Sequence, residues 1–291
     1  MHTIYDNITK IDKGWSNDQK YHIKYKGSDY LLRVSPSESS QRIHRLFDIT
    51  DDLAHLGVPI CKPIELIKHN DTIHVLYSWI DGEDMIDVIG QYSKSVQYQY
   101  GLDAGKYLKH IHSIKAPDSI EPWDTRFNSK IDRNIKKYHG STLDIPETSL
   151  FIDYLESSRH LLKNRPQCFH HGDYHMGNFM IDKHDKLIVI DFDRYDFGDP
   201  WEEFNRIVWS VENSPSFARG IIDGYFDGKV PDTFWELLLL YISSNTMSSL
   251  TWALGLDDDQ LKVMINQMHD VLDWYENFTR TIPKWYTTKY L

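Results

Sequence analysis

Cysteine is almost absent from this chain, whose 291 residues include only Cys61 and Cys168. Two cysteines so far apart in the sequence are too few for a disulfide framework or for a cysteine-based zinc site. We therefore expect both to be buried thiols.

Long hydrophobic runs are also lacking. The stretch MHTIYDNITK at residues 1–10 has neither the basic start nor the apolar core of a secretory signal. No segment approaches the roughly 18 apolar residues of a membrane span. We expect a cytoplasmic protein without a membrane partner.

Positive charge is in deficit. The chain has 32 Lys and Arg against 43 Asp and Glu, a formal charge of −11. This excess disfavours nonspecific nucleic-acid binding and is compatible with a cationic small substrate. Apolar residues, in contrast, make up 41% of the chain and aromatic residues 13%, as in globular proteins. The length suggests two lobes, although one large domain remains open, and the oligomeric state is not indicated.

The first third of the chain has the pattern of an antiparallel sheet. Alternating apolar residues predict a hairpin around a turn at residues 26–29, and a second hairpin around Asn70-Asp71. Between them, helical periodicity over residues 43–53 ends before Gly57 and Pro59. We expect a nucleotide-binding lobe at residues 1–80.

Helical periodicity dominates the rest, which predicts a helical lobe at residues 81–291 that contains the catalytic loop, the metal site and the acceptor site. Short apolar runs within residues 168–192 predict a small sheet among the helices. The long amphipathic segments are 96–112, 151–162, 231–254 and 257–278.

Histidines are concentrated in FHHGDYHMGNFMI, residues 169–181. A zinc hydrolase needs three or four converging ligands, commonly at fixed helical spacings. His170, His171 and His175 instead surround glycines, with no such spacing. We interpret them as structural residues and keep a metal-dependent hydrolase as an alternative.

Asp173, Asn178 and Asp191 form a more specific pattern. Carboxylate and amide oxygens are ligands that suit Mg²⁺. In phosphoryl transfer by kinases, one Asp orients the substrate hydroxyl, an Asn five residues later holds metal, and a second Asp bridges metal to the phosphates. The set therefore indicates phosphoryl transfer.

The sequence HGDYHMGN followed by IDFDRYDFGDP resembles two motifs of the aminoglycoside phosphotransferase and choline kinase family, which comprises small-molecule kinases. These motifs cover about thirty residues, and the order of the expected lobes extends the resemblance more loosely. It implies an α+β, bilobal protein-kinase-like fold. Such a fold has a small antiparallel-sheet N-terminal lobe and a larger, mainly helical C-terminal lobe.

The resemblance also implies roles for the motif residues. Asp173 would be the catalytic base, and Asn178 and Asp191 would bind Mg²⁺. His171 would brace the catalytic loop. Asp199, in the Gly-Asp-Pro motif, would anchor the following loop.

In the expected nucleotide-binding lobe, the resemblance places Arg33 where kinases typically have Lys. Its partner on the helix would be Asp48, with Glu38 as the second choice. The phosphate-covering loop would be DKGWSNDQK, residues 12–20, which has the single glycine Gly14. An ordinary hairpin turn explains this loop equally well.

The junction between the lobes resembles an adenine-contacting linker. The Ser78 carbonyl and the Ile80 N–H would face the purine, and Tyr77 would occupy the gatekeeper position. A tyrosine there resembles family members that accept GTP, so we expect ATP as co-substrate with GTP possible.

Acidic and aromatic residues after the metal loop are candidates for binding the acceptor. Carboxylates could bind ammonium groups, and aromatic rings could cover a choline-like head group. For each residue alone, a solvated surface position is the more common role. The expected contacts are Asp193, Glu202 and Glu203, with Asp196, Trp201 and Glu212 as further candidates.

These observations lead to the hypothesis of a Mg²⁺-dependent phosphotransferase. It would move the γ-phosphate of ATP, or of GTP, to a hydroxyl of an aminoglycoside-type antibiotic or a similar cationic or sugar-like metabolite. Antibiotic resistance is one biological role that fits. The alternatives are a non-catalytic nucleotide-binding regulator and, less favoured, the metal-dependent hydrolase.

Overall fold

The computed structural model describes residues 5–12 and 18–288 and divides the chain into two compact units. The sheet unit comprises residues 1–88 and 178–195, and the helical unit comprises residues 89–177 and 196–291. The chain thus returns to the sheet unit at Asn178, the last residue of the HGDYHMGN motif. The expected lobes at 1–80 and 81–291 did not include this return.

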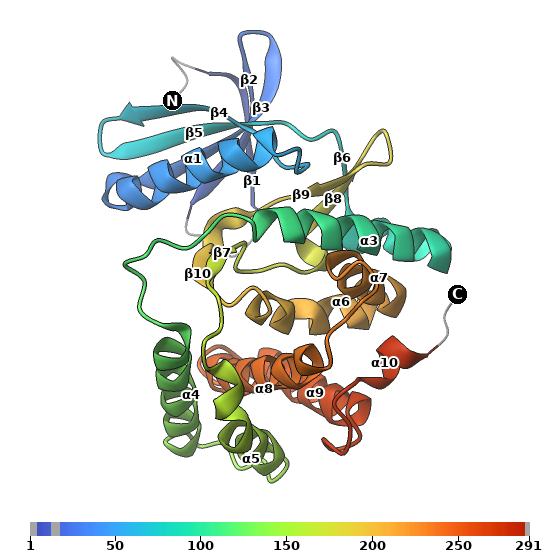
Figure 1. The fold of residues 1–291 in the computed structure, drawn as a ribbon. Coiled ribbons are helices and arrows are strands. Elements are labelled where there is room, and N and C mark those ends of the chain that lie inside the picture. The colour runs from blue at the N-terminus through green and yellow to red at the C-terminus, as the bar shows by residue number, and fades with distance from the viewer. Residues whose placement is uncertain (1–4, 13–17, 289–291) are drawn as a thin grey trace. The chain divides into compact units, whose positions relative to one another are not determined.

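The sheet unit contains a five-stranded antiparallel sheet with the strand order β1-β2-β3-β5-β4 (Figure 1). Ile23, Leu32 and Leu76 are fully buried in its core. The strands are β1 (Asp6–Ile11), β2 (Gln19–Tyr25), β3 (Ser28–Pro36), β4 (Pro63–His69) and β5 (Thr72–Ser78).

The β2–β3 turn is tighter than the expected four residues. It consists of Lys26 and Gly27, both with positive φ (50° and 83°), as in the two-residue hairpin turns that match strand twist. This turn fixes the register, in which Lys20 lies directly opposite Arg33. The β4–β5 turn is at Asn70-Asp71 as expected, with Asn70 at φ 53°.

Helix α1 (Ser40–His55) follows the short 3-10 helix η1 (Ser37–Ser39) and contains the predicted helical segment. Its Ile43 and Phe47 pack against the core around Ile73 and Val75 of β5, so the helix covers one face of the sheet (Figure 1). It ends before Gly57, whose φ of 82° continues no right-handed helix.

A second sheet of the same unit joins distant segments: β6 (Gly82–Asp84), β8 (Phe179–Asp182) and β9 (Leu187–Val189), in the order β6-β8-β9, with α2 (Met85–Val88) after β6. The expected single sheet over residues 168–192 is therefore wrong in part. Strand β7 (Cys168–His170) pairs instead with β10 (Asp196–Gly198) in the helical unit. Pairing partners outside the predicted segment decided this arrangement.

The helical unit is built around α8, most of whose residues are buried, with α4, α5 and α9 packed against it (Figure 1). Within the described residues, no helix combines the length and apolar character needed to span a bilayer. The α-helices are α3 (Lys94–Ile111), α4 (Trp123–His139), α5 (Thr148–Ser158), α6 (Ile207–Asn213), α7 (Pro215–Tyr225), α8 (Asp232–Ala253), α9 (Asp258–Trp274) and α10 (Lys284–Thr287). The 3-10 helices of both units are, besides η1, η2 (Ile89–Gln91), η3 (Arg159–Leu162), η4 (Met176–Asn178), η5 (Phe192–Arg194) and η6 (Glu202–Arg206).

Glycines allow α3 and α7 to pack backbone against backbone. A Cβ at Gly101 would lie 2.2 Å from the Phe217 carbonyl oxygen, and one at Gly105 would lie 2.2 Å from the Ile221 carbonyl oxygen. Real Cβ atoms do not approach backbone so closely, so any side chain here would push the helices apart.

The mixed α+β class expected from the sequence is confirmed.

We predict that Gly105→Ala destabilises the protein by about 1–3 kcal/mol through overpacking, despite the higher helix propensity of alanine. Gly90→Ala is the matched control, because a Cβ at Gly90 meets nothing within 4 Å. Urea unfolding followed by circular dichroism measures both. Equal stabilities for the two variants would contradict the close approach of α3 and α7.

Candidate active site

Asp191 follows β9 in the sheet unit and lies between two cations. Lys20 Nζ donates to its Oδ2 at 3.2 Å, and Arg33 Nη1 donates to its Oδ1 at 3.4 Å. The backbone of Asp191 is left-handed (φ 64°, ψ 64°), a conformation that costs energy in most residues and that Asp tolerates better than most. Such strain is concentrated at functional sites.

The buried Arg33 has carboxylate partners that the sequence did not predict. Besides Asp191, its guanidinium pairs with Asp18, at 3.1 Å between Nη2 and Oδ2, and with Asp193. The expected pairing with Asp48 is wrong for the described residues: Asp48 is exposed on α1, and no ion pair between it and Arg33 is found there. The second choice, Glu38, is also exposed.

Lys20 was missed by the sequence analysis. The hairpin register places it opposite Arg33, so two neighbouring strands bring two cations to one carboxylate. A two-residue turn at Lys26-Gly27 would have predicted this pairing, because it fixes which residues face each other. The expected four-residue turn concealed it.

Asn178 stands at the start of β8, and the β8–β9 hairpin brings it to the end that carries Asp191. Phe179 pairs with Val189, and the Ile190 N–H donates to the Asn178 carbonyl at 3.0 Å. An amide oxygen and a carboxylate at one end of a hairpin are hard oxygen donors of the kind Mg²⁺ prefers. Their chemistry therefore fits the expected metal.

The expected phosphate-covering loop lies mostly outside the described residues, since Gly14, Ser16 and Asn17 fall in the gap at 13–17. Of its flanks, Asp18 is described and pairs with Arg33.

The expected adenine-contacting segment ends β5. Tyr77 is buried, and this burial raises the pKa of its hydroxyl to about 12. The Ser78 N–H donates to the Lys62 carbonyl at 2.8 Å, and the Ser78 carbonyl accepts from Cys61 Sγ at 3.1 Å. Ile80 follows the strand and is partly exposed. Ser78 is thus fixed from inside the sheet unit.

In the helical unit, two buried side chains accept hydrogen bonds from the backbone of Gly172 and Asp173. His171 is fully buried, and its Nδ1 accepts the Asp173 N–H at 3.3 Å. The Glu203 carboxylate, 2% exposed, accepts the Gly172 N–H at 2.9 and 3.2 Å. The hydrogen bonds to His171 and Glu203 therefore hold the backbone next to Asp173 in place.

The Asp173 carboxylate has a cationic neighbour that the motif does not contain. Arg206 Nε lies 3.4 Å from its Oδ1, and His175 Nε2 lies 3.6 Å from its Oδ2. The Asp173 side chain is 19% exposed and so remains accessible to a small molecule. Arg206 was not predicted from the sequence, because it lies on η6, after the end of the two motifs.

The expected acceptor contacts belong to two different units of the chain. Asp193 belongs to the sheet unit and pairs with Arg33. Glu202 is mostly buried, with Lys130 Nζ 3.0 Å from its Oε1. Glu203 is too deeply buried to contact an acceptor, so its expected role is corrected to support of the catalytic loop.

Asp199 forms the anchor expected of it. Its fully buried carboxylate accepts from Arg165 Nε at 2.6 Å and Nη2 at 2.9 Å, from the Tyr241 hydroxyl at 2.6 Å and from the Trp201 N–H at 3.0 Å. Burial and the charge of Asp199 raise the pKa of Tyr241, which therefore stays a hydrogen-bond donor. These hydrogen bonds to the buried carboxylate thus all come from residues of the helical unit.

Comparison with known proteins decides the family. The sequence profile of the Phosphotransferase enzyme family matches residues 7–235, well over half of the chain. The chain belongs to this family. It is thus a phosphotransferase, as its two motifs indicated. Compared with curated proteins by sequence, it has no significant match.

Solved structures similar to this phosphotransferase confirm the protein-kinase-like fold. A thermostable mutant of aminoglycoside phosphotransferase APH(4)-Ia superposes with a TM-score of 0.65 at 14% identity, over 92% of this chain and 94% of the other. The gentamicin complex of APH(2")-IIa gives 0.64 at 16%, over 91% of each chain. A choline/ethanolamine kinase family protein from Mesorhizobium loti gives 0.65 at 14%, over 94% and 90%.

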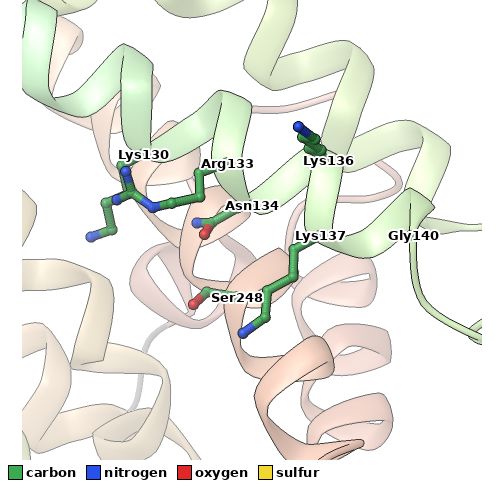
Figure 2. Close-up of a pocket in the computed structure, with 7 residues that line it drawn as sticks. All are labelled: Lys130, Arg133, Asn134, Lys136, Lys137, Gly140 and Ser248. Atoms are coloured by element: carbon green, nitrogen blue, oxygen red, sulfur yellow. The ribbon is translucent and has the colours of Figure 1, made fainter.

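The helical unit of the phosphotransferase also has a basic pocket of about 750 Å³ between α4 and α8 (Figure 2). Asn134, one of its lining residues, donates a hydrogen bond from its side-chain amide to the Ser244 carbonyl at 3.3 Å. None of the predicted site residues lines the pocket, so we assign it no part in phosphoryl transfer. The lining residues are Lys130, Arg133, Asn134, Lys136, Lys137, Gly140 and Ser248.

We predict that Asp199→Asn destabilises the phosphotransferase by about 3–5 kcal/mol, because it leaves the Arg165 cation without a buried counter-charge. Asp196→Asn is the matched control: its ion pair with Arg126 is exposed and worth about 0–1 kcal/mol. Thermal unfolding compares the two. A small loss at Asp199, similar to that at Asp196, would show that the anchor is not needed.

Proposed function

We propose that this phosphotransferase carries out Mg²⁺-dependent transfer of the γ-phosphoryl group of ATP, or of GTP, to a hydroxyl of a cationic, sugar-like small molecule in the cytoplasm. The observation that carries the proposal is the braced Asp173 in the matched motif, followed by Asn178 and Asp191 at one end of a hairpin. This is the combination that kinase-type phosphoryl transfer requires.

Asp173 is the proposed catalytic residue of the helical unit. Its carboxylate would accept a hydrogen bond from the acceptor hydroxyl and direct the oxygen toward the phosphorus atom. A carboxylate with an ordinary pKa near 4 is a weak base for an alcohol, so orientation is its main contribution. Arg206 Nε, 3.4 Å from Asp173 Oδ1, would limit rotation of the carboxylate through this ion pair.

Asn178 and Asp191 of the sheet unit are the proposed metal ligands. Magnesium bound there would neutralise charge on the phosphates during transfer. Lys20 and Arg33 would add positive charge at the same carboxylate and are the proposed contacts to the nucleotide phosphates. The proposed adenine contacts remain Ser78 and Ile80, beside Tyr77.

The proposal requires Asp173 and the metal ligands to act on one phosphoryl group. Only five positions separate Asp173 from Asn178, so the backbone allows at most about 18 Å between them. Phosphoryl transfer depends chiefly on positioning and charge neutralisation, and these residues supply both.

The acceptor class is proposed from three similar structures. Their descriptions name hygromycin B with ADP, gentamicin, and the choline/ethanolamine kinase family. An amino-group-bearing acceptor is also compatible with the charge of −11. Glu202 and Asp193 remain proposed acceptor contacts, and resistance to an aminoglycoside is the biological role that this acceptor implies.

The alternative of a non-catalytic nucleotide-binding regulator has two supporting features, Arg33 at the position where kinases typically have Lys, and the single glycine in the expected phosphate-covering loop at residues 12–20. Lys20 beside Arg33 weakens the first argument, because a lysine is present at the same carboxylate. The intact Asp173, Asn178 and Asp191 favour catalysis.

Asp173→Asn is expected to lower turnover by about 10²–10⁴-fold, the usual contribution of a positioned general base, with little change in nucleotide affinity. Release of nucleoside diphosphate measures turnover, and titration calorimetry measures binding. Asp185→Asn, on the exposed β8–β9 turn, is the control and should keep full turnover. Turnover by the Asp173 variant equal to that of the parent would refute its assignment.

Diphosphate release with ATP and with GTP should be stimulated by members of a panel of aminoglycosides, choline, macrolides, methylthioribose and homoserine. We expect stimulation by an aminoglycoside and its loss when Mg²⁺ is chelated. Stimulation by an uncharged acceptor alone would refute the proposed acceptor class. Magnesium-independent turnover would refute the metal assignment.

A further inference from the structure

Three side chains with strong affinity for transition metals meet in the interior of the helical unit. His112 follows α3, and Cys168 and His170 are the first and last residues of β7. One ligand atom from each lies within 4.8 Å of the other two. All three side chains are buried, with exposed fractions of 4% for each histidine and 6% for Cys168.

The two histidines each have a buried nitrogen without a hydrogen-bond partner among the described residues. Both atoms are Nε2. The other nitrogen of His112 is held by the Tyr225 hydroxyl at 3.0 Å, and that of His170 lies 3.7 Å from Glu202. A buried polar atom without a partner is destabilising, so two such atoms in one cluster indicate that something binds there.

We propose that His112, Cys168 and His170 form a binding site for a divalent transition metal, with Zn²⁺ as the natural candidate. Imidazole and thiolate are both common ligands of zinc in proteins. The site is separate from the Asn178–Asp191 pair, whose oxygen donors suit Mg²⁺ instead.

The geometry needs only a small adjustment. Tetrahedral zinc holds nitrogen and sulfur ligands about 3.3–3.7 Å apart, given its bond lengths of about 2.0–2.3 Å. Closing separations of up to 4.8 Å to this range requires movements of about 1 Å shared among three side chains. The Tyr225 hydroxyl at Nδ1 of His112 and the Glu202 carboxylate near Nδ1 of His170 would hold the two rings in place, as outer groups do in most metal–histidine sites.

Charge also balances at this position. Binding would convert the Cys168 thiol to a thiolate and release its proton to solvent, leaving one net positive charge on the metal centre. The carboxylate of Glu203, with Oε2 3.8 Å from His112 Nε2, offers the compensating negative charge and a candidate fourth ligand. Burial lowers the pKa of His112, which favours the neutral imidazole that metals bind.

Burial opposes binding at one ligand. It raises the pKa of Cys168, so without a metal the residue is an uncharged thiol. A divalent cation overcomes this effect, because a coordinating thiol is deprotonated outright. We therefore expect the metal to enter during folding, before the cluster is buried.

The position of the cluster gives the metal a structural consequence. It would join the end of α3 to β7, directly before the loop that carries His171 and Asp173. Glu203 contacts both His112 and the Gly172 N–H, so occupancy would be transmitted to the backbone of the catalytic loop. The inference itself does not depend on the proposed function.

The test uses full-length Cys61→Ser protein, in which Cys168 is the remaining cysteine. It is produced in medium supplemented with Zn²⁺ or with Co²⁺ and then freed of loosely bound ions on a chelating column. We expect one metal per chain by mass spectrometry, and a thiolate-to-Co²⁺ charge-transfer absorption in the cobalt form. That band reports coordination by Cys168 without requiring its substitution.

Two further variants assign the histidines. His112→Gln and His170→Gln should each reduce retained metal by about tenfold or more, as loss of a ligand or its support does. His184→Gln, on an exposed turn, should retain metal fully. Zinc should also raise the midpoint of thermal unfolding of the Cys61→Ser protein.

Several outcomes would overturn the site. They are a Cys61→Ser protein that retains no metal, a cobalt form without the thiolate band, and equal retention by the His184 and His170 variants. The first outcome would point to a buried water as the partner of the two Nε2 atoms.

Discussion

The structure of the helical unit depends on two buried carboxylates that accept hydrogen bonds from the backbone near its HGDYHMGN and Gly-Asp-Pro motifs. Glu203 accepts the Gly172 N–H, and Asp199 is surrounded by Arg165, Tyr241 and the Trp201 N–H. A buried charge is costly unless its lone pairs are satisfied, and each of these carboxylates has donors. The backbone segments that contain Gly172 and Trp201 therefore have little freedom to move. That rigidity would suit the role proposed for Asp173, because phosphoryl transfer relies on orientation more than on strong bases.

In the sheet unit, ion pairs hold the side chains around Asp191 in place. Asp191 is contacted by Lys20 and Arg33, and Arg33 pairs in addition with Asp18 and Asp193. Three carboxylates against two cations leave a net negative charge, which suits a divalent cation near Asp191. Phosphates arriving with such a cation would then compete for the same guanidinium and ammonium groups. The pairs around Asp191 thus hold the cationic side chains close to where phosphates would bind.

The histidines of the catalytic segment separate into distinct roles. His171 braces the loop through its hydrogen bond with the Asp173 N–H, and His175 lies beside the Asp173 carboxylate. His170 instead lies in a cluster with His112 and Cys168. The sequence analysis weighed a zinc site among the three neighbouring histidines only. The cluster uses only His170 of these three, together with Cys168 of the same strand β7 and His112 directly after α3.

The sequence by itself determined the family, the α+β class, the main hairpins and helices, and the catalytic motif, because these depend on local periodicity and short spacing. Tertiary structure decided what joins distant segments: the β6–β8 pairing, the strand partner of β7, the placement of Arg206 beside Asp173, and the burial of Glu203. The pairing of Arg33 shows the difference. Its position on a strand followed from alternation, whereas its partners were set by a two-residue turn and by the return of residues 178–195 to the sheet unit. Contacts between residues far apart in sequence leave no local pattern, so only the folded chain reveals them.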